Sequence, residues 1–512
     1  MLAELFQQTA KKFPHQIALV CDRLRMSYQQ LNSTVEGLSQ GLISLKIGQG
    51  DCVTLLLPNC PEFVFSFHAI ARLKAIALPL NHLFKGEELS YCLNESYTRA
   101  IITDRKRLDI CRQAIAKLDR KIELIVIDGV EPETHYFQDL ILTDLTSIER
   151  EENYPFSGDL LYQYSSGSTG LPKRVCRTQS HLYHEVKNFT ETTQISPADK
   201  ILCTVPLYHA HGLGNCLLAA TCTGATLVIL EQVLQKDGTP IEVPFVFRRP
   251  RILELMQKEK ITIFPAVPYI FNTLAEAPED RSIDLSNLRL SFSAGNFLPQ
   301  EIAQKFWQRF RIPVRQLYGC TEAGSMAINL ESDYEITQAS VGFALNNVEI
   351  KIVNEEGREL STGMVGEIVI KSPSLTSGYS NLPELNQQAF KNGYFWTGDL
   401  GKKDEAGRLY LTGRKKLLID TGGRKVDPLE VEEILGNHPK IQEAVVVGVK
   451  GDYAGELVKA VLVKKHQETC AEAEIFSFCK ERLAEFKIPK IIEFRPEIPK
   501  SPLGKILRKE LV

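Results

Sequence analysis

Residues 164–173 read Tyr164-Ser-Ser-Gly-Ser-Thr-Gly-Leu-Pro-Lys173, the most distinctive stretch of this 512-residue sequence. Two glycines and four hydroxyl side chains lie within seven positions, and a lysine follows. Glycines allow consecutive backbone N–H groups to converge on one point, and such a nest binds anionic oxygens. The hydroxyls add hydrogen-bond donors, and Lys173 adds a positive charge. The stretch therefore predicts a phosphate-binding loop.

The loop differs from a Walker A motif, because two residues separate Gly170 from Lys173. The alternative is a flexible Ser/Gly linker, which the Pro172-Lys173 ending makes less attractive. The residues that we assign to phosphate binding are Ser165, Ser166, Gly167, Ser168, Thr169, Gly170 and Lys173.

Alternating strands and helices are predicted on both sides of this loop. Residues 52–57 form a short apolar run typical of a buried strand, and residues 61–74 have the apolar spacing of a helix that Pro61 opens. Similar segments alternate up to about residue 130 and again over residues 251–310. Such alternation favours parallel sheets covered by helices, and therefore an α/β fold.

The last third of the chain has a different pattern. After about Ser340, short β-rich pieces punctuated by glycines predict a smaller β-lobe. Beyond Gly413 we expect an α+β unit with helices over residues 428–435 and 471–485. Asp427, Pro428 and Glu430 fit the start of the first of these helices. We predict a large multi-lobed domain over residues 1–412 and a small domain over residues 413–512.

Composition narrows the function classes. The 60 Lys and Arg residues nearly balance the 63 Asp and Glu residues, so the net charge of −3 gives no general attraction to nucleic acid or membranes. No apolar run reaches the ~18 residues that a membrane span needs. The N-terminus mixes acidic, amide and lysine side chains, so we expect no signal peptide and a cytoplasmic location. The 12 cysteines include no C-x-x-C pair and are expected to be reduced core thiols.

Three further motifs carry chemistry. Gln316-Leu-Tyr-Gly-Cys-Thr-Glu322 combines a stacking ring (Tyr318), a glycine for close backbone approach (Gly319), a hydroxyl (Thr321) and a hard oxygen ligand for Mg²⁺ (Glu322). In a second motif, Asp399 and Arg414 could bind a ribose, although a surface Asp–Arg pair is the alternative. In the third, prolines and a glycine shape the basic tail around Lys505, so this lysine looks presented to a site.

In this order the motifs resemble the adenylate-forming (ANL) superfamily of acyl- and aryl-CoA ligases, luciferases and peptide-synthetase adenylation domains. The resemblance runs from near residue 5 to the C-terminus. It includes the further stretches Pro206-Leu-Tyr-His-Ala-His-Gly212, Ser293-Ala-Gly-Asn-Phe-Leu-Pro299 and Gly422-Gly-Arg-Lys-Val-Asp-Pro-Leu-Glu-Val-Glu432. The resemblance implies ATP-dependent activation of a carboxylic acid to an acyl-adenylate, followed by transfer to the thiol of CoA.

The resemblance also implies roles for single residues. Ser168, Thr169 and Lys173 would hold the β- and γ-phosphates of ATP, and Glu322 with Thr169 would bind Mg²⁺. Lys505 would bridge the substrate carboxylate and the α-phosphate. The adenine slot would be formed by Gly295, Asn296, Phe297 and Tyr318, and the nucleotide would also be bound by Gln316, Gly319 and Thr321. The ribose would be bound by Asp399 and Arg414.

The second step, acyl transfer to the thiol, needs different residues of the small domain at the active site. In the family the small domain rotates about a hinge, which corresponds to Lys416, and a loop with Gly422 and Gly423 then lies along the pantetheine channel. His209, beside Tyr208, would shape the carboxylate pocket; a packed core histidine is the alternative.

The substrate and the acceptor stay open. Residues 206–214 carry no acidic side chain to pair a substrate ammonium, which disfavours a free α-amino acid and leaves aliphatic, aromatic or hydroxylated acids. The phosphopantetheine of an acyl carrier protein is an alternative acceptor to CoA. A catalytically inactive nucleotide-binding regulator is the alternative from another class, and the presence of Lys505 and Glu322 argues against it.

Two departures from the family pattern are evident. Arg174 follows Lys173 where the family usually has glycine, and Asn296 replaces a common alanine. Residues 231–250 form a long connection before a helix expected from Ile252. This connection could be a surface hairpin, and contact with CoA phosphates or an acidic carrier domain is the alternative to a plain solvated loop.

Overall fold

The computed structural model describes residues 2–141, 158–165, 173–235, 240–241, 243–278, 283–295, 298–331, 339–414, 419–451, 455–499, 506 and 508–512. Of the residues singled out above, those outside these ranges are Ser166, Gly167, Ser168, Thr169, Gly170, Asn296, Phe297, Lys416 and Lys505. For Ser165 and Arg414 only the backbone is described.

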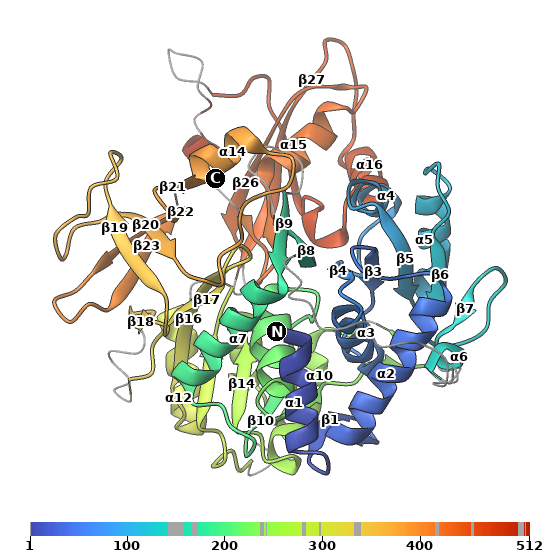
Figure 1. The fold of residues 1–512 in the computed structure, drawn as a ribbon. Coiled ribbons are helices and arrows are strands. Elements are labelled where there is room, and N and C mark those ends of the chain that lie inside the picture. The colour runs from blue at the N-terminus through green and yellow to red at the C-terminus, as the bar shows by residue number, and fades with distance from the viewer. Residues whose placement is uncertain are drawn as a thin grey trace.

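The first half of the chain builds a seven-stranded sheet in the order β7-β6-β5-β3-β4-β8-β9 (Figure 1). All its pairs are parallel except the β8–β9 pair, which flanks the predicted phosphate loop. Its strands are β3 (Cys52–Leu56), β4 (Ile76–Pro79), β5 (Thr98–Thr103), β6 (Glu123–Val126), β7 (His135–Tyr136), β8 (Asp159–Ser165) and β9 (Lys173–Thr178).

A nine-stranded sheet lies beside it, in the order β18-β17-β16-β15-β14-β10-β11-β1-β2. The pairs from β16 to β1 are parallel, and the edge strands β2, β17 and β18 are antiparallel. Its strands are β1 (Ile17–Cys21), β2 (Leu24–Ser27), β10 (Lys200–Cys203), β11 (Thr226–Ile229), β14 (Ile263–Ala266), β15 (Leu290–Ser293), β16 (Val314–Cys320), β17 (Gly324–Ile328) and β18 (Phe343–Ala344).

Helices cover these sheets, as the alternation predicts. They are α1 (Leu2–Lys12), α2 (Tyr28–Ser44), α3 (Pro61–Arg72), α4 (Gly86–Glu95), α5 (Arg105–Ile115), α6 (Phe137–Ile141), α7 (Gln179–Thr193), α8 (Ala210–Gly212), η1 (Leu213–Leu218), α9 (Ala219–Thr221), α10 (Phe245–Lys258), α11 (Pro268–Ala275) and α12 (Gln300–Phe310). Helix α3 is buried on nearly every side, because its core cluster joins strands of both sheets. The α/β expectation is confirmed.

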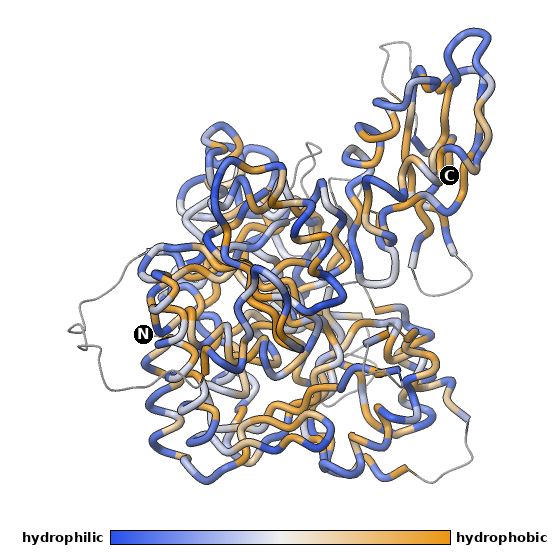
Figure 2. Tube along the Cα trace, turned by 90° about the vertical axis from the view of Figure 1, so that its right-hand side faces the viewer, coloured by the Kyte–Doolittle hydropathy of each residue, from blue (hydrophilic) through white to orange (hydrophobic). Residues whose placement is uncertain are grey.

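The smaller β-lobe is an antiparallel sheet of β19 (Glu349–Val353), β20 (Gly366–Lys371), β21 (Phe390–Lys391), β22 (Tyr394–Lys403) and β23 (Leu409–Arg414), with α14 (Pro383–Ala389) beside it. The C-terminal unit, described here from residue 419, contains β24 (Ile419–Asp420), β25 (Lys425–Val426), α15 (Pro428–Gly436), β26 (Ile441–Lys450), β27 (Glu456–Lys464), α16 (Glu472–Arg482) and β28 (Ile491–Phe494). Hydrophobic residues run along its strands, at the upper right of Figure 2.

The long connection over residues 231–250 contains the expected hairpin, a short pair of β12 (Val233–Leu234) and β13 (Pro240–Ile241). The helix start expected at Ile252 is wrong, since α10 begins at Phe245 and includes Pro250. A proline removes one helical hydrogen bond near the helix start without ending the helix. Arg251 binds Glu231 at 2.8 Å, and Arg248 donates to the Glu231 carbonyl at 2.7 Å.

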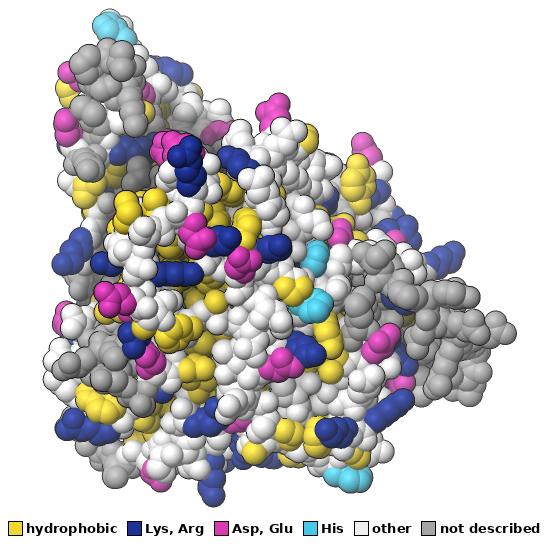
Figure 3. Space-filling view, turned by 60° about the vertical axis from the view of Figure 1, so that its left-hand side comes forward, with side chains coloured by type: hydrophobic (Ala, Val, Ile, Leu, Met, Phe, Trp, Pro, Cys, Tyr) yellow, Lys and Arg dark blue, Asp and Glu magenta, His cyan; other side chains and the backbone are white. Residues whose placement is uncertain are grey.

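The surface in Figure 3 has Lys, Arg, Asp and Glu side chains interspersed, in line with the balanced composition. Within the described ranges, no helix has both the length and the apolar character needed to cross a membrane.

A buried histidine on α3 should make stability depend on pH. His68 is 2% exposed, lies 3.1 Å from the Thr221 hydroxyl and stacks on Phe6. Burial lowers its pKa from 6.5 to about 3. The unfolded chain therefore binds a proton below pH 6.5 that the folded chain does not, so stability falls as pH drops from 7 to 5. His68 accounts for about 2 kcal/mol of this loss.

Replacing His68 by glutamine should remove that part of the pH dependence. Urea unfolding at pH 7 and pH 5 would measure the free energy of unfolding for both proteins. The loss on acidification should be smaller by about 2 kcal/mol in His68→Gln. An unchanged difference between the two pH values would contradict a neutral His68. The exposed His466 offers a matched control, His466→Gln.

Candidate active site

One large cavity of about 2120 Å³ lies where both large sheets, the β-lobe and the C-terminal unit meet. Most of the predicted site residues that the structure describes line it. These are Lys173, Tyr208, His209, Gly295, Tyr318, Gly319, Thr321, Glu322, Asp399, Gly422 and Gly423. Gln316 lies behind the wall, where its side chain accepts a hydrogen bond from the Leu298 N–H at 3.4 Å. Motifs that are far apart in the sequence thus converge on one space.

Tyr318 and Asp399 join the main α/β part to the β-lobe. The Tyr318 hydroxyl, at the end of β16, donates to Oδ2 of Asp399 on β22 at 2.7 Å, and both side chains are buried. Burial, together with the Asp399 charge, raises the pKa of Tyr318, so the phenol stays protonated as the donor. On the neighbouring strand β23, the backbone of Arg414 pairs with that of Asp399. The two residues predicted to bind a ribose are therefore direct cross-strand neighbours.

Gly319 is needed for a contact within the protein. A Cβ atom placed on it would lie 2.6 Å from the Gly324 carbonyl oxygen across the β16–β17 turn. The close backbone approach that the sequence predicts therefore includes this turn. Gly295, by contrast, has positive φ (+84°) and open space where a Cβ would project.

Glu322 and Lys173 are linked by a residue that the sequence analysis missed. The Tyr379 hydroxyl donates to Oε1 of Glu322 at 2.7 Å, and the Lys173 ammonium lies 5.1 Å from the centre of the Tyr379 ring. Burial and the Glu322 charge raise the pKa of Tyr379. Tyr379 comes from the connection after β20, which pairs with β9 at Val175. No motif surrounds Tyr379, so only the tertiary fold reveals it.

The unexpected Arg174 contacts helix α4. Its guanidinium donates to the Glu95 carbonyl at 2.7 Å, forms an ion pair with the Glu95 carboxylate at 3.2 Å and lies over the Tyr162 ring. These contacts attach the end of β9 to helix α4. The side chain that replaces the family's usual glycine thus has a structural role.

The aromatic-His segment presents two different histidines. His209 caps α8 through its Nδ1 and its ring is exposed to the cavity. Desolvation at the cavity wall, together with the charge on Lys425, lowers the pKa of His209 to about 4. His211 is 6% exposed, and burial lowers its pKa to about 3. Both rings are therefore neutral at pH 7, and neither supplies positive charge to the cavity.

Residues of the C-terminal unit line part of the cavity, and this unit lies at the top of Figure 1. Gly422 and Gly423 both have positive φ, and a Cβ atom on Gly423 would lie 3.4 Å from Cγ1 of Val267. The ammonium of Lys487 joins the unit to helix α4, with ion pairs of 2.9 Å to Glu88 and 2.6 Å to Glu430.

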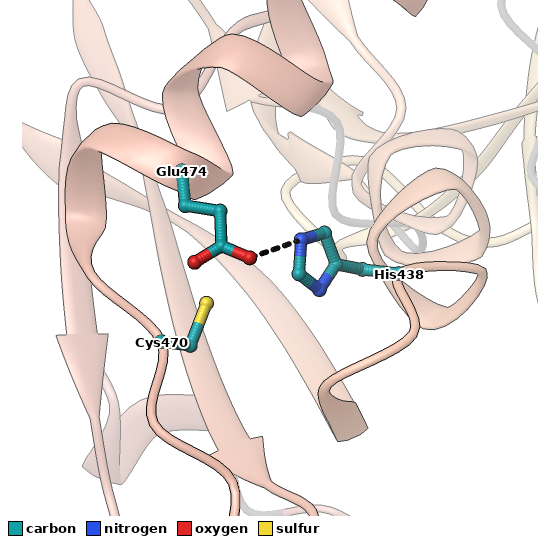
Figure 4. A group of neighbouring side chains, drawn as sticks. All are labelled: His438, Cys470 and Glu474. Carbon is teal, nitrogen blue, oxygen red and sulfur yellow. Dashed lines mark ion pairs between the residues drawn. The ribbon is translucent and has the colours of Figure 1, made fainter.

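A separate group in the C-terminal unit consists of His438, Cys470 and Glu474 (Figure 4). Their possible ligand atoms lie within 4.8 Å of one another. However, the Lys440 ammonium lies 2.9 Å from Glu474, and Nδ1 of His438 accepts the Lys440 N–H. Because a cation already neutralises the carboxylate, we assign this group a structural role.

Comparison with known proteins gives the family. The sequence model "AMP-binding enzyme" matches residues 6–380, and "AMP-binding enzyme C-terminal domain" matches residues 430–505. An oxalate–CoA ligase of Arabidopsis thaliana is 32% identical over 99% of this chain and 97% of its own length. The chain therefore belongs to the AMP-binding enzyme family. It is an AMP-forming acid–thiol ligase, which activates a carboxylic acid with ATP and transfers the acyl group to CoA.

Two solved structures agree with this fold. A double mutant of the o-succinylbenzoate CoA synthetase from Bacillus subtilis, bound with its product analogue OSB-NCoA, matches with a TM-score of 0.85 and 26% identity. The match covers 99% of this chain and 98% of that one. An anthranilate CoA ligase in complex with anthranoyl-AMP matches with a TM-score of 0.73 and 26% identity, over 100% and 96% of the chains.

Proposed function

We propose that this ligase activates an aliphatic or aromatic carboxylic acid, but not a free α-amino acid, inside the large cavity. The observation that carries the proposal is the convergence of Lys173, Glu322, Tyr318 and Asp399 on that one space. Residues 206–214, several of which line the cavity, carry no carboxylate for a substrate ammonium. A buried ammonium without a partner would be costly, so the acid carries none beside its carboxylate.

The nucleotide would extend from the β8–β9 hairpin to the β-lobe. Ser168, Thr169 and Lys173 bind the β- and γ-phosphates, with Ser165, Ser166, Gly167 and Gly170 shaping the loop. The adenine slot is formed by Gly295, Asn296, Phe297 and Tyr318, with Gly319 and Thr321 beside it and Gln316 behind the wall. Asp399 and Arg414 bind the ribose, which their cross-strand pairing supports.

The donor set at Glu322 fits Mg²⁺, since carboxylate and hydroxyl oxygens are the ligands that this ion prefers. Tyr379 holds Oε1 of Glu322 and so orients the carboxylate. Glu322 and Thr169 would bind the ion, which when bound neutralises phosphate charge.

Charge neutralisation is the main demand of the first step, because a carboxylate attacks an anionic phosphate. Lys173 reduces the repulsion at the leaving pyrophosphate, and Lys505 reduces it where the carboxylate meets the α-phosphate. Neutral His209 shapes the carboxylate pocket without adding charge. The products are the acyl-adenylate and pyrophosphate.

The second step would use a rotated small domain. Residues 1–412 and 413–512 form two bodies joined by a hinge at Lys416, and rotation exchanges Lys505 for the Gly422–Gly423 loop. The described arrangement has that loop at the cavity. At equal identity, the chain is also more similar to the product-analogue complex than to the anthranoyl-AMP complex. Both observations support assigning this arrangement to thiol transfer.

An ATP–pyrophosphate exchange screen over acids of varied length and aromaticity tests the proposal. We expect exchange with at least one such acid and none with α-amino acids. The purified acyl-adenylate of the best acid is then offered to CoA and, separately, to a carrier protein with phosphopantetheine. Faster turnover with CoA is expected. Exchange with α-amino acids alone, or no reaction with CoA, would contradict the proposal.

A further inference from the structure

Part of the cavity lining is a wall of uncharged polar side chains. His211, Asn215 and Ser325 line it, and each is more than nine-tenths buried. Ser325 Oγ donates to Asn215 Oδ1 at 2.8 Å, and Asn215 Nδ2 lies 2.9 Å from His211 Nδ1. His211 Nε2 lies 3.2 Å from the carbonyl oxygen of Ala266. These bonds tie α8 and η1 to the ends of β14 and β17.

The donor and the acceptor of each hydrogen bond follow from the Ala266 carbonyl group. Since the Ala266 oxygen can only accept, His211 carries its proton on Nε2 and its Nδ1 accepts. Asn215 must then donate through Nδ2, which leaves its oxygen to accept the Ser325 hydroxyl. This order uses one of the two Asn215 N–H groups and the only Ser325 donor. One Asn215 N–H and the lone pairs of Ser325 Oγ remain available to a ligand.

A buried ion pair lies behind this wall, and its carboxylate is the member that faces the wall. Glu185 on α7 and Arg177 on β9 form a buried ion pair of 2.5 Å through Oε2 of Glu185. The other oxygen, Oε1, faces the wall: a Cβ atom on Gly214 or on Gly324 would lie 2.3 Å from it. Gly324 itself lines the cavity, so Oε1 lies close behind the cavity wall.

We propose that the acid which this ligase activates carries a hydroxyl group at the end far from its carboxylate, and that Asn215 and Ser325 bind this hydroxyl. This inference rests on the proposed function, because it presumes that the carboxylate lies on the nucleotide side of the cavity. A hydroxyl both accepts and donates, so it can accept the free Asn215 N–H and donate to Ser325 Oγ. The free Asn215 N–H is the donor and Ser325 Oγ is the acceptor that such a hydroxyl needs.

Other end groups fit less well. A methyl group would displace water from the Asn215 N–H and Ser325 Oγ without replacing its hydrogen bonds, which is unfavourable. A second carboxylate would approach Glu185 Oε1. Among the described residues, no lysine or arginine hydrogen-bonds His211, Asn215 or Ser325 to offset that charge. The neutral His211 does not offset it either.

The test compares matched acids in ATP–pyrophosphate exchange. For each straight-chain length, and for a phenyl-substituted series, the end group is methyl, hydroxyl or carboxylate. For the best chain length, kcat/KM of the hydroxy acid should exceed the values of the methyl-ended and carboxylate-ended acids by about tenfold to a hundredfold. Ser325→Ala should reduce this advantage by about tenfold while changing kcat/KM of the methyl-ended acid much less.

Two controls keep the outcome clear. Ser325→Cys, with a similar volume but a weak acceptor, should show the same loss if Ser325→Ala folds poorly. Ser361→Ala, at an exposed position, should keep the preference. Preference for a methyl or carboxylate end, or a hydroxyl preference that survives both Ser325 variants, would overturn this inference alone. Exchange with none of the acids would overturn the proposed function and this inference with it.

Discussion

A Lys505→Ala variant should form acyl-adenylate at least about 100-fold more slowly than the unaltered ligase. In the proposed first step, the Lys505 ammonium lies between two anions while charge builds at the α-phosphorus. Its loss therefore raises the energy of the transition state more than that of bound ATP. The remaining phosphate contacts, including Lys173, should largely preserve ATP binding. Pyrophosphate release and equilibrium nucleotide binding measure the two effects separately.

A lysine in the same tail provides the control for this variant. Lys509 lies four positions after Lys505, so Lys509→Ala removes the same charge from the same segment. That variant should release pyrophosphate at nearly the normal rate. When purified acyl-adenylate and CoA are supplied, Lys505→Ala should also transfer the acyl group normally, because the second step does not use this lysine. An unchanged rate of pyrophosphate release in Lys505→Ala would show that its assignment is wrong.

The fold could be predicted well where local patterns report tertiary position. The strand expected over residues 52–57 and the helix over 61–74 correspond to β3 (Cys52–Leu56) and α3 (Pro61–Arg72). The start of α5 was harder, because it depends on Asp104, whose side chain accepts the Arg107 N–H at 3.1 Å. Strand order, such as β10 between β14 and β11, is not encoded in any local pattern.

In the candidate site, too, local sequence patterns do not reveal which residues contact each other. Motifs identified Tyr318 and Asp399 as site residues, but their hydrogen bond spans 81 positions and follows only from the fold. Asn215 and Ser325 belong to no motif with a recognisable spacing, and their hydrogen bond spans 110 positions. Glu430 matches a helix-start pattern in the sequence, yet its carboxylate binds Lys487 in the folded chain. Local sequence therefore identifies reactive residue types, whereas partners depend on long-range packing.

A Lys487→Met variant should slow acyl transfer to CoA about 100-fold more than it slows acyl-adenylate formation. The Lys487 side chain is 8% exposed, between Glu88 of α4 and Glu430 of α15. Burial alone would lower the pKa of Lys487, but the two carboxylates outweigh burial and raise it. Without the ammonium, two carboxylates would face each other in a nearly dry place. Breaking such a buried ion pair costs about 3–5 kcal/mol.

That penalty should apply to one domain arrangement only. When the C-terminal unit rotates away, Glu88 and Glu430 separate, water reaches both, and the repulsion disappears. Methionine at position 487 therefore disfavours the arrangement that places Gly422 and Gly423 at the cavity, which we assign to thiol transfer. Single-turnover rates of the two half-reactions measure the difference directly.

The chain offers both a control and a rescue for this variant. Lys480→Met removes an exposed lysine of α16, outside the cavity lining, and should leave the ratio of the two rates unchanged. Adding Glu88→Gln and Glu430→Gln to Lys487→Met removes the repulsion, so the triple variant should recover most of the acyl transfer. If Lys487→Met slows both half-reactions equally, or if the triple variant recovers nothing, this ion-pair cluster does not control the domain arrangement. If the triple variant recovers acyl transfer, the Lys487 ion pairs stabilise the domain arrangement that we assign to thiol transfer.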